Sequence, residues 1–347
     1  MWLEDEGCGK VVDLAWRRIC LGNPMAQVEG KIKACQAKLK QWSRTSFGNI
    51  THTLQEKKQQ LRQEEHRATR EGTMEIVNRL KWEINGLLIK EEKMWKQRLR
   101  ALWLQEGDQN TKFFHNKASH RYKRNRIEEL KNEARVVCTD EEEISKILID
   151  YYQNLFTSAS PSNMEEVLMA VPTVITDKQN AMLVAEFAKN EVEEAIQQMA
   201  PLKAPRPDGL PPLFYQKFWP SIGEDVLKAV LNCLNSGSIP SSINRTFITL
   251  IPKVNSPYVV SEFHPISLCN VIYKIVSKVA ANKLKKVLPF IISDSQSAFQ
   301  SNKAISNNIL VAFELLHHMK TQKSKKASFM TLKLDMSKCT TGWNGSF

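Results

Sequence analysis

The sequence lacks the patterns that mark a secreted, disulfide-stabilised or membrane protein. Its seven cysteines are an odd number without a Cys-x-x-Cys pair, which favours reduced thiols over a disulfide framework or a zinc site. The first residues have neither a basic segment nor an apolar run, so they do not form a signal peptide. No apolar stretch is long enough to cross a bilayer. We therefore expect an intracellular protein of the nucleus or cytoplasm that has no membrane partner.

Acidic residues are few relative to basic ones. The chain of 347 residues has 49 Lys and Arg against 37 Asp and Glu, a formal net charge of +12. This balance favours a polyanionic partner, and RNA or DNA is the commonest, although a basic solvated surface alone would give the same count. The length allows two domains, or one large domain with an extension.

Apolar residues recur at helical spacing over two stretches of the first 110 residues. These two stripes are Val28, Ile32, Cys35, Leu39 and Trp42, and then Val77, Leu80, Ile84, Leu87, Met94, Leu99 and Leu102. Because a charged segment separates the stripes, they predict an antiparallel helical hairpin that resembles a coiled coil over part of its length. The charges of residues 55–70 are typical of a solvated face.

A basic stretch with interleaved aromatic residues follows Gly107. It predicts a nucleic-acid-binding helix, because cations pair with phosphates and aromatic rings stack on bases. Phe113 and Phe114 would equally serve to dock this helix on the body. The predicted nucleic-acid-binding residues are Lys112, Lys117, Arg121, Lys123, Arg124 and Arg126.

The best candidate for a domain boundary is the Ser- and Pro-rich segment 157–163. Before it, Thr139 and Glu142 form a capping-box pattern that predicts a helix through Tyr152. We therefore expect a helical region over residues 1–156 and a second domain over residues 164–347. The fold class expected is α+β and mostly helical, with a helical arm first and the strands concentrated after residue 240.

The second region alternates helical and extended patterns. A rigid, Pro-rich loop at 201–212 separates the first two predicted helices. The elements predicted are helices at Thr176–Ala200, Leu213–Ser236 with Gly237 at its end, Asn270–Val287 and Ile305–Met319, and a strand at Arg245–Pro252.

Leu332, Leu334 and Met336 alternate with polar residues near the end of the chain, which predicts a strand with one buried face. Asp335 lies on its other face, where a carboxylate could bind a hard cation such as Mg²⁺.

Several of these segments together closely resemble the reverse transcriptase of plant non-LTR (LINE-type) retrotransposons. One of them, 203–209, is similar to that family's Lys-Ala-Pro-Gly-Pro-Asp-Gly loop. In order, the segments are Trp103–His115, Lys203–Gly209, Phe247–Lys253, Phe263–Ile275, Ser295–Phe299 and Leu332–Lys338.

The resemblance implies an RNA-directed DNA polymerase with a right-hand architecture, of which residues 164–347 would form the fingers and the start of the palm. It implies that Asp335 is the first catalytic, metal-binding aspartate and that Mg²⁺ is the cofactor. It also implies that Lys253 lies among the residues that approach the incoming nucleotide. His264 would share this nucleotide-binding role, although it stands where the family has Arg.

The chain also departs from the family pattern. Arg206 replaces a Gly, Cys339-Thr340-Thr341 replaces Ala-Tyr-Asp, and no Tyr-x-Asp-Asp motif is present. Because phosphoryl transfer needs two metal ions held by several carboxylates, we expect a truncated, catalytically inactive polymerase fragment. The alternative is a non-catalytic nucleic-acid-binding or coiled-coil interaction protein.

Overall fold

The computed structural model describes residues 5–46, 48–71, 74–99, 120, 123–132, 134–157, 164–169, 171–202, 208–293, 296, 303–321 and 330. Helices dominate these residues, as the sequence predicted, and both long strands lie after residue 240. Among the described residues no helix is long and apolar enough to cross a membrane.

The elements follow the chain in a simple order. The helices before residue 200 are α1 (Glu6–Trp16), α2 (Pro24–Ser46), α3 (Ile50–Glu71), α4 (Glu75–Leu99), α6 (Glu141–Phe156), α7 (Met164–Met169), α8 (Asp177–Val184) and α9 (Lys189–Gln197). The later helices are α10 (Pro212–Lys217), α11 (Trp219–Ser236), α12 (Ser241–Asn244), α13 (Val271–Lys285), α14 (Leu288–Ile291) and α15 (Ile305–Thr321). The strands are β1 (Leu130–Lys131), β2 (Val137–Cys138), β3 (Thr246–Pro252) and β4 (Phe263–Cys269).

The chain divides into two compact units, one of residues 1–137 and 186–280 and the other of 138–185 and 281–347. This division does not follow the predicted boundary at 157–163. The physical reason is that the apolar stripe of α2 is covered by helices from the second half of the sequence. The predicted division into a helical region over residues 1–156 and a second domain over residues 164–347 stays a prediction. The first compact unit of the structure instead contains the first helices together with later ones.

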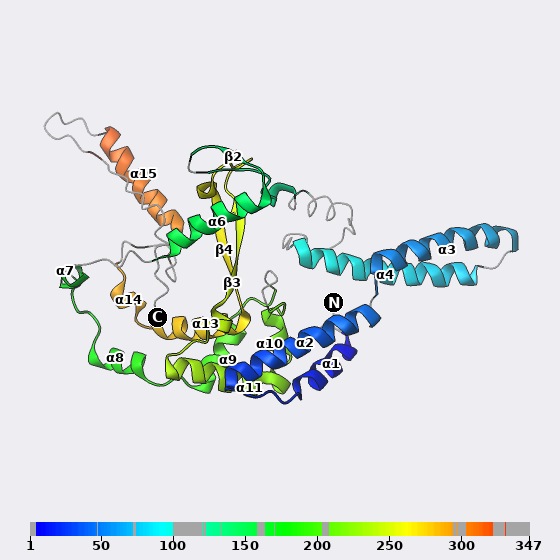
Figure 1. The fold of residues 1–347 in the computed structure, drawn as a ribbon, viewed down its shortest axis with the longest axis horizontal. Helices are drawn as coiled ribbons and strands as arrows, with labels where there is room; N and C mark the ends of the chain where they lie inside the picture. The colour runs from blue at the N-terminus through cyan, green and yellow to red at the C-terminus, as the bar shows by residue number, and fades with distance from the viewer. Residues whose placement is uncertain are drawn as a thin grey trace. The chain divides into compact units, whose positions relative to one another are not determined.

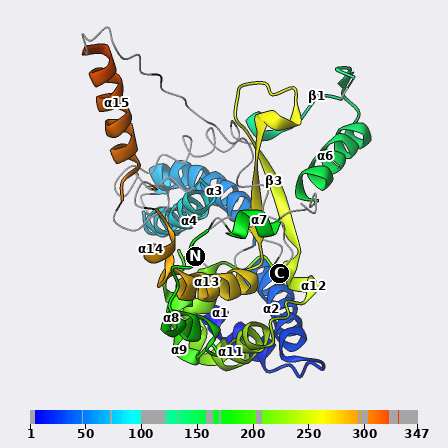
Figure 2. The ribbon, with the colours of Figure 1, turned by 90° about the vertical axis from the view of Figure 1, so that its left-hand side faces the viewer.

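The first unit is built around one hydrophobic core. Helices α1, α2, α9, α10, α11 and α13 gather there in both views (Figures 1 and 2). Val28 and Cys35 of α2 are fully or almost fully buried in this core, as are Val226 and Val230 of α11. Burial raises the pKa of the Cys35 thiol to about 12, so this thiol stays protonated and acts as a small apolar side chain.

Three helices of this core meet at Asp225. The indole Nε1–H of Trp16 in α1 donates to Asp225 Oδ2 at 2.8 Å, and Lys31 Nζ in α2 donates to the same oxygen at 2.6 Å. Burial alone would raise the pKa of Asp225, but the hydrogen bonds from Lys31 and Trp16 and the Lys31 charge outweigh it and lower that pKa. Asp225 of α11 therefore holds the N-terminal helices to the later part of the chain.

A helical hairpin is present in the first unit, but its two arms are α3 and α4 (Figure 1). Lys57 pairs with Glu83 at 2.7 Å and Lys81 with Glu65 at 3.1 Å, contacts that only antiparallel helices make. The prediction that the first apolar stripe pairs with the second was wrong, because α2 packs in the main core instead. The charged segment 55–70 lies in α3, and most of its side chains are exposed, as predicted for a solvated face.

Strands β3 and β4 pair in antiparallel register to form a two-stranded ribbon. Thr246 lies opposite Cys269 at the base of the ribbon, and Pro252 lies opposite Phe263 at its far end. β3 confirms the predicted strand, whereas β4 was not predicted. Pro265 is tolerated within β4 because each strand of a two-stranded ribbon has an outward edge that needs no N–H donor.

Two predicted helices are broken in the structure. The helix expected over Thr176–Ala200 is split into α8 and α9, because the Phe187 N–H donates to Asn235 Oδ1 of α11 at 2.8 Å and leaves the helical path. The helix expected over Leu213–Ser236 is split at Phe218, and Pro220 lies in the first turn of α11. Gly237 ends α11 with a φ of 67°, as predicted.

The second unit contains α6, α7, α8, α14 and α15. The N-cap of α6 is Asp140, whose carboxylate accepts from the N–H groups of Glu142 and Glu143. This corrects the capping box predicted from Thr139. The predicted helix from Ile305 is confirmed as α15, whose side chains Leu310 and Phe313 are exposed.

Candidate nucleic-acid interface

Only part of the predicted basic helix lies within the described residues. Lys112, Lys117 and Arg121 are outside them. Lys123 and Arg124 lie in a short helical turn and are exposed. Arg126 is also exposed, and its Nε lies 3.9 Å from Glu128 Oε1. These three cations are accessible to a polyanion, and their role in binding stays a prediction.

Lys253 and His264 lie together near the far end of the ribbon. Ile251 is directly opposite His264, and the backbone N–H of Lys253 donates to the carbonyl of Glu262 at 2.8 Å. Residues opposite each other in an antiparallel pair share a face, so Lys253 and His264 project from the same face of the ribbon. The Lys253 ammonium donates to the Ser261 carbonyl at 2.9 Å, and both side chains are exposed.

The proposed metal-binding residue, Asp335, lies outside the described residues. Within the described part of the chain, no group of three or more His, Cys, Asp or Glu side chains is arranged to bind a metal ion. The Mg²⁺ assignment therefore stays a prediction that rests on the resemblance.

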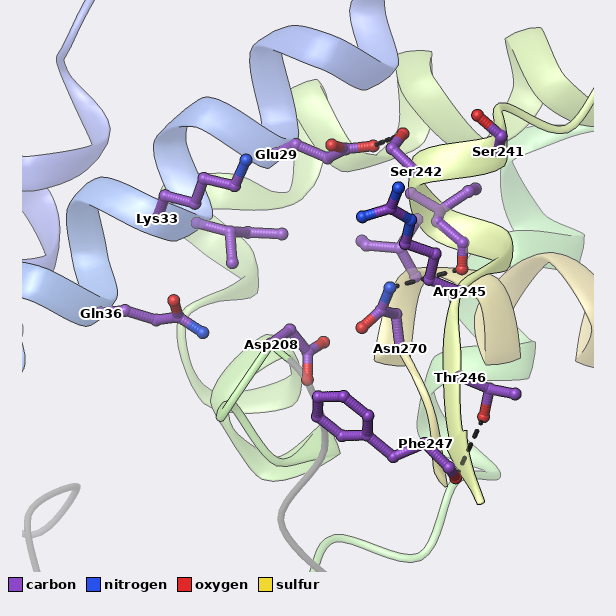
Figure 3. A pocket seen from close by; sticks show the side chains of 13 residues that line it. Glu29, Lys33, Gln36, Asp208, Ser241, Ser242, Arg245, Thr246, Phe247 and Asn270 are labelled. Atoms are coloured by element: carbon purple, nitrogen blue, oxygen red, sulfur yellow. Dashed lines mark hydrogen bonds between the residues drawn. The ribbon is translucent and has the colours of Figure 1, made fainter. Parts of the chain in front are cut away.

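A pocket with a volume of about 730 Å³ lies at the base of the ribbon (Figure 3). Its walls come from α2, from α12, from the start of β3 and from the start of α13. The lining residues are Glu29, Ile32, Lys33, Gln36, Asp208, Ser241, Ser242, Ile243, Arg245, Thr246, Phe247, Asn270 and Ile272.

The ribbon separates this pocket from the predicted nucleotide-binding residues. Lys253 follows Thr246 by seven positions, and a strand rises roughly 3.3 Å per residue, so the two residues are about 23 Å apart along β3. Neither Lys253 nor His264 lines the pocket. The structure thus brings the two predicted residues together, but at the opposite end of the ribbon from the pocket.

Asp208 and Gly209 of the Pro-Asp-Gly sequence have two different structural roles, a helix cap and a left-handed backbone position. The Asp208 carboxylate accepts from the Val271 N–H at 2.9 Å, so it caps the first residue of α13 from 63 positions away. Gly209 has a φ of 61°, and a Cβ there would lie 3.3 Å from the Gln36 Nε2 in α2. The sequence identified this segment as a rigid loop that resembles a family motif but did not reveal the cap, because no local pattern indicates a long-range helix cap.

The pocket contains charged residues that sequence reasoning did not select. Glu29 accepts a hydrogen bond from the Ser242 hydroxyl at 2.5 Å. Lys33 and Arg245 are exposed and form no ion pair with any residue that the structure describes. The available signal for Arg245 and Phe247 was a basic residue at the first position of the predicted strand with an aromatic residue two positions later.

Comparison with known proteins shows a similarity to a transposon protein. The chain is 30% identical over 222 residues to an uncharacterized 149 kDa protein of transposon TX1 from Xenopus laevis. The match covers 63% of the chain but only 17% of the Xenopus protein. No protein-family model matches the chain. The sequence is therefore similar to part of a transposon protein, which agrees in general terms with its resemblance to retrotransposon sequences.

Proposed function

We propose that these 347 residues are part of a retrotransposon RNA-directed DNA polymerase. The 347 residues bind nucleic acid but do not polymerise by themselves. The observation that carries the proposal is the ordered series of resembling segments, together with the similarity to a transposon protein. The segments also contact one another. Asp208 of segment 203–209 caps α13, which begins in segment 263–275, and β3, which covers most of segment 247–253, pairs with β4.

The chemistry follows from the residues that the resemblance selects. Asp335 would hold Mg²⁺, which would polarise the phosphate that is attacked. Lys253 would neutralise charge on the incoming nucleotide from the far end of the ribbon, and the neighbouring His264 would offer it a ring hydrogen bond. Because Asp335 is the single motif aspartate in residues 1–347, and Mg²⁺ needs near-octahedral oxygen ligation, these residues alone do not fix two metal ions.

Nucleic-acid binding tests the first part of the proposal. The triple variant Lys123→Gln, Arg124→Gln and Arg126→Gln should bind single-stranded RNA more weakly than the parent. If each residue contacts one phosphate, the slope of log affinity against log salt should become shallower by about 2, since each contact contributes roughly 0.7. Fluorescence anisotropy across a salt titration measures this slope.

A matched control removes three charges from the solvated face of α3, with Lys58→Gln, Arg62→Gln and Arg70→Gln. All three side chains are exposed. The control should retain the parent's salt slope. If the two triple variants have equal salt slopes, the basic segment contributes to binding only through the net charge of the protein. If the parent does not bind RNA, the nucleic-acid role is refuted.

Primer extension tests the second part. Purified protein with Mg²⁺, a primed RNA template and all four deoxynucleotides should yield no extended primer, because the further carboxylates are absent from residues 1–347. Product that disappears in the Asp335→Ala variant would contradict this expectation and would mean that a second chain supplies the missing ligands. Reading the coding DNA that follows in all frames for Tyr-x-Asp-Asp tests the polymerase origin independently.

The non-catalytic alternative is supported by the α3–α4 hairpin. Its helices bury Leu54, Val77, Leu80 and Ile84 against each other, while Trp82 remains 77% exposed on the outer side of α4. Trp is enriched among the residues that dominate binding energy at protein interfaces, so Trp82 is the position that tests this alternative. If Trp82→Ala leaves nucleic-acid binding intact yet changes the oligomeric state, the hairpin acts as an interaction module.

A further inference from the structure

The pocket at the ribbon base has the size of a small-ligand site and two chemically different parts. Its volume of about 730 Å³ lies in the range of about 300–1,000 Å³ that is usual for ligand pockets. Ile32, Ile243 and Ile272 contribute apolar surface, and the surface of the pocket as a whole is mostly apolar, although most of the residues that line it are polar or charged. Lys33 and Gln36 extend from α2 on one side, and Arg245 and Asn270 face them from the other (Figure 3).

The two exposed charges of the lining are the cations Lys33 and Arg245, whereas its two carboxylates are half-buried and balance them in formal charge. Both carboxylates already accept hydrogen bonds within the protein, Glu29 from Ser242 and Asp208 from the Val271 N–H. The two cations, Lys33 and Arg245, have no ion-pair partner among the described residues and are exposed at the pocket. Phosphate is a strong match for this pair, since an Arg guanidinium binds phosphate oxygens in a bidentate manner and a Lys ammonium adds a point charge.

The aromatic wall favours a planar group attached to that anion. Phe247 lines the pocket and is 62% exposed, so its ring is accessible to a ligand. A base that stacks on such a ring gains affinity whatever its identity, because every base has a π-face. A nucleotide combines the planar group and the anion in one unit.

We propose that this pocket binds one unpaired nucleotide of a nucleic-acid strand, with its base against Phe247 and its phosphate between Lys33 and Arg245. The proposal rests on the nucleic-acid binding proposed above and gives it a place apart from Lys253 and His264. A free nucleoside monophosphate has the same chemistry. The strand is favoured because the net charge of +12 attracts the flanking phosphates as well.

Stacking is tested with a single-stranded oligonucleotide that carries 2-aminopurine, whose fluorescence is quenched when the base stacks. The Phe247→Leu variant should bind about tenfold more weakly, within the range known for loss of one base–aromatic contact, and should lose the quenching. Phe290→Leu is the matched control, because Phe290 is 59% exposed and does not line the pocket. It should behave as the parent does.

The phosphate contact is tested with the double variant Lys33→Gln and Arg245→Gln. Its salt slope should become shallower than the parent's by about 0.7 to 1.4, as expected for one or two lost single-strand phosphate contacts. The control, Lys38→Gln with Lys40→Gln, removes the same charge from exposed positions of α2 outside the pocket and should leave the slope unchanged. Circular dichroism should show the same helix content in all four variants.

Three outcomes overturn the proposal. If the parent binds the strand but the pocket variants match their controls, the pocket is not the site, although the nucleic-acid function stands. If a blunt duplex binds as tightly as the strand and is weakened equally by Phe247→Leu, the ligand is not an unpaired nucleotide. If adenosine monophosphate quenches and competes at the affinity of the strand, the pocket serves free nucleotides. A parent that binds neither RNA nor DNA would instead refute the nucleic-acid function itself.

Discussion

Replacing Asp225 with Ala should destabilise the first unit more than its partial exposure suggests. Asp225 Oδ2 accepts hydrogen bonds from the Trp16 indole and from the Lys31 ammonium, and these donors belong to two different helices. Without the carboxylate, Trp16 loses its acceptor while only 5% exposed, and Lys31 loses its counter-ion while its side chain is 15% exposed. Two buried or nearly buried donors would then be unsatisfied.

The magnitude follows from these contacts. A hydrogen bond to a charged group contributes roughly 1.5–3 kcal/mol where water is excluded. The Asp225 side chain is 33% exposed, so water replaces part of each interaction and the sum must be discounted. We expect the Asp225→Ala variant to lose about 1–3 kcal/mol in its free energy of unfolding. Asp225→Asn retains an acceptor for Trp16 without the charge, so it should lose less.

Urea denaturation followed by tryptophan fluorescence measures the effect, because Trp16 lies in the contact itself. Glu224→Ala is the matched control. Glu224 neighbours Asp225 and pairs with Lys228 at 2.8 Å, but its side chain is 83% exposed, and exposed pairs of this kind contribute little to stability. If Asp225→Ala and Glu224→Ala shift the midpoint equally, Asp225 does not join the N-terminal helices to α11, and our reasoning about this contact fails.

Two further predictions concern acid and backbone strain. The pKa of Asp225 is lowered in the folded state. Its contribution to stability is therefore complete above the ordinary carboxyl pKa of about 3.9 and is lost as the pH falls through the lowered value. The stability difference between the parent and Asp225→Ala, measured by urea denaturation, should vanish in strong acid and persist at neutral pH. Gly209→Ala should reduce thermal stability by more than Gly237→Ala. Both glycines have a left-handed φ, which costs roughly 1–2 kcal/mol for an L-residue, but only at Gly209 would the Cβ approach another side chain, that of Gln36. Equal losses would show that Gln36 moves aside freely.

Local sequence patterns predicted where helices and strands form better than they predicted which of these elements pack against each other. The spacing of Val28, Ile32 and Cys35 identified an amphipathic helix, and all three residues are buried. The same spacing carries no information about which surface covers it, so the pairing with the second stripe was wrong. α2 packs against α1, which precedes it, and against α11, almost 200 positions later. The second partner depends on contacts that no short window of sequence contains.

The elements that were missed share a long-range cause. β4 contains Pro265, which argues against a strand unless the edge position is known. The break between α8 and α9 depends on Asn235, 48 positions from Phe187. The cap of α13 comes from Asp208, 63 positions before Val271. In each case a partner distant in sequence decides the local conformation, and a reading based on period and propensity cannot include it.

The pocket was not predicted although parts of its lining lie in recognised segments, because its residues meet only through contacts between parts of the chain that are distant in sequence. Asp208 and Phe247 belong to two of the segments that resemble the polymerase family, and Asn270 to a third. Lys33 lies in the N-terminal helices, which the sequence assigned to a separate arm. The Lys31–Asp225 pair and the Glu29–Ser242 hydrogen bond both hold α2 against later parts of the chain. In this position Lys33 faces Arg245 across the pocket. Loss of the Asp225 contact should therefore weaken nucleotide binding at the pocket as well as stability, since the wall formed by α2 depends on it.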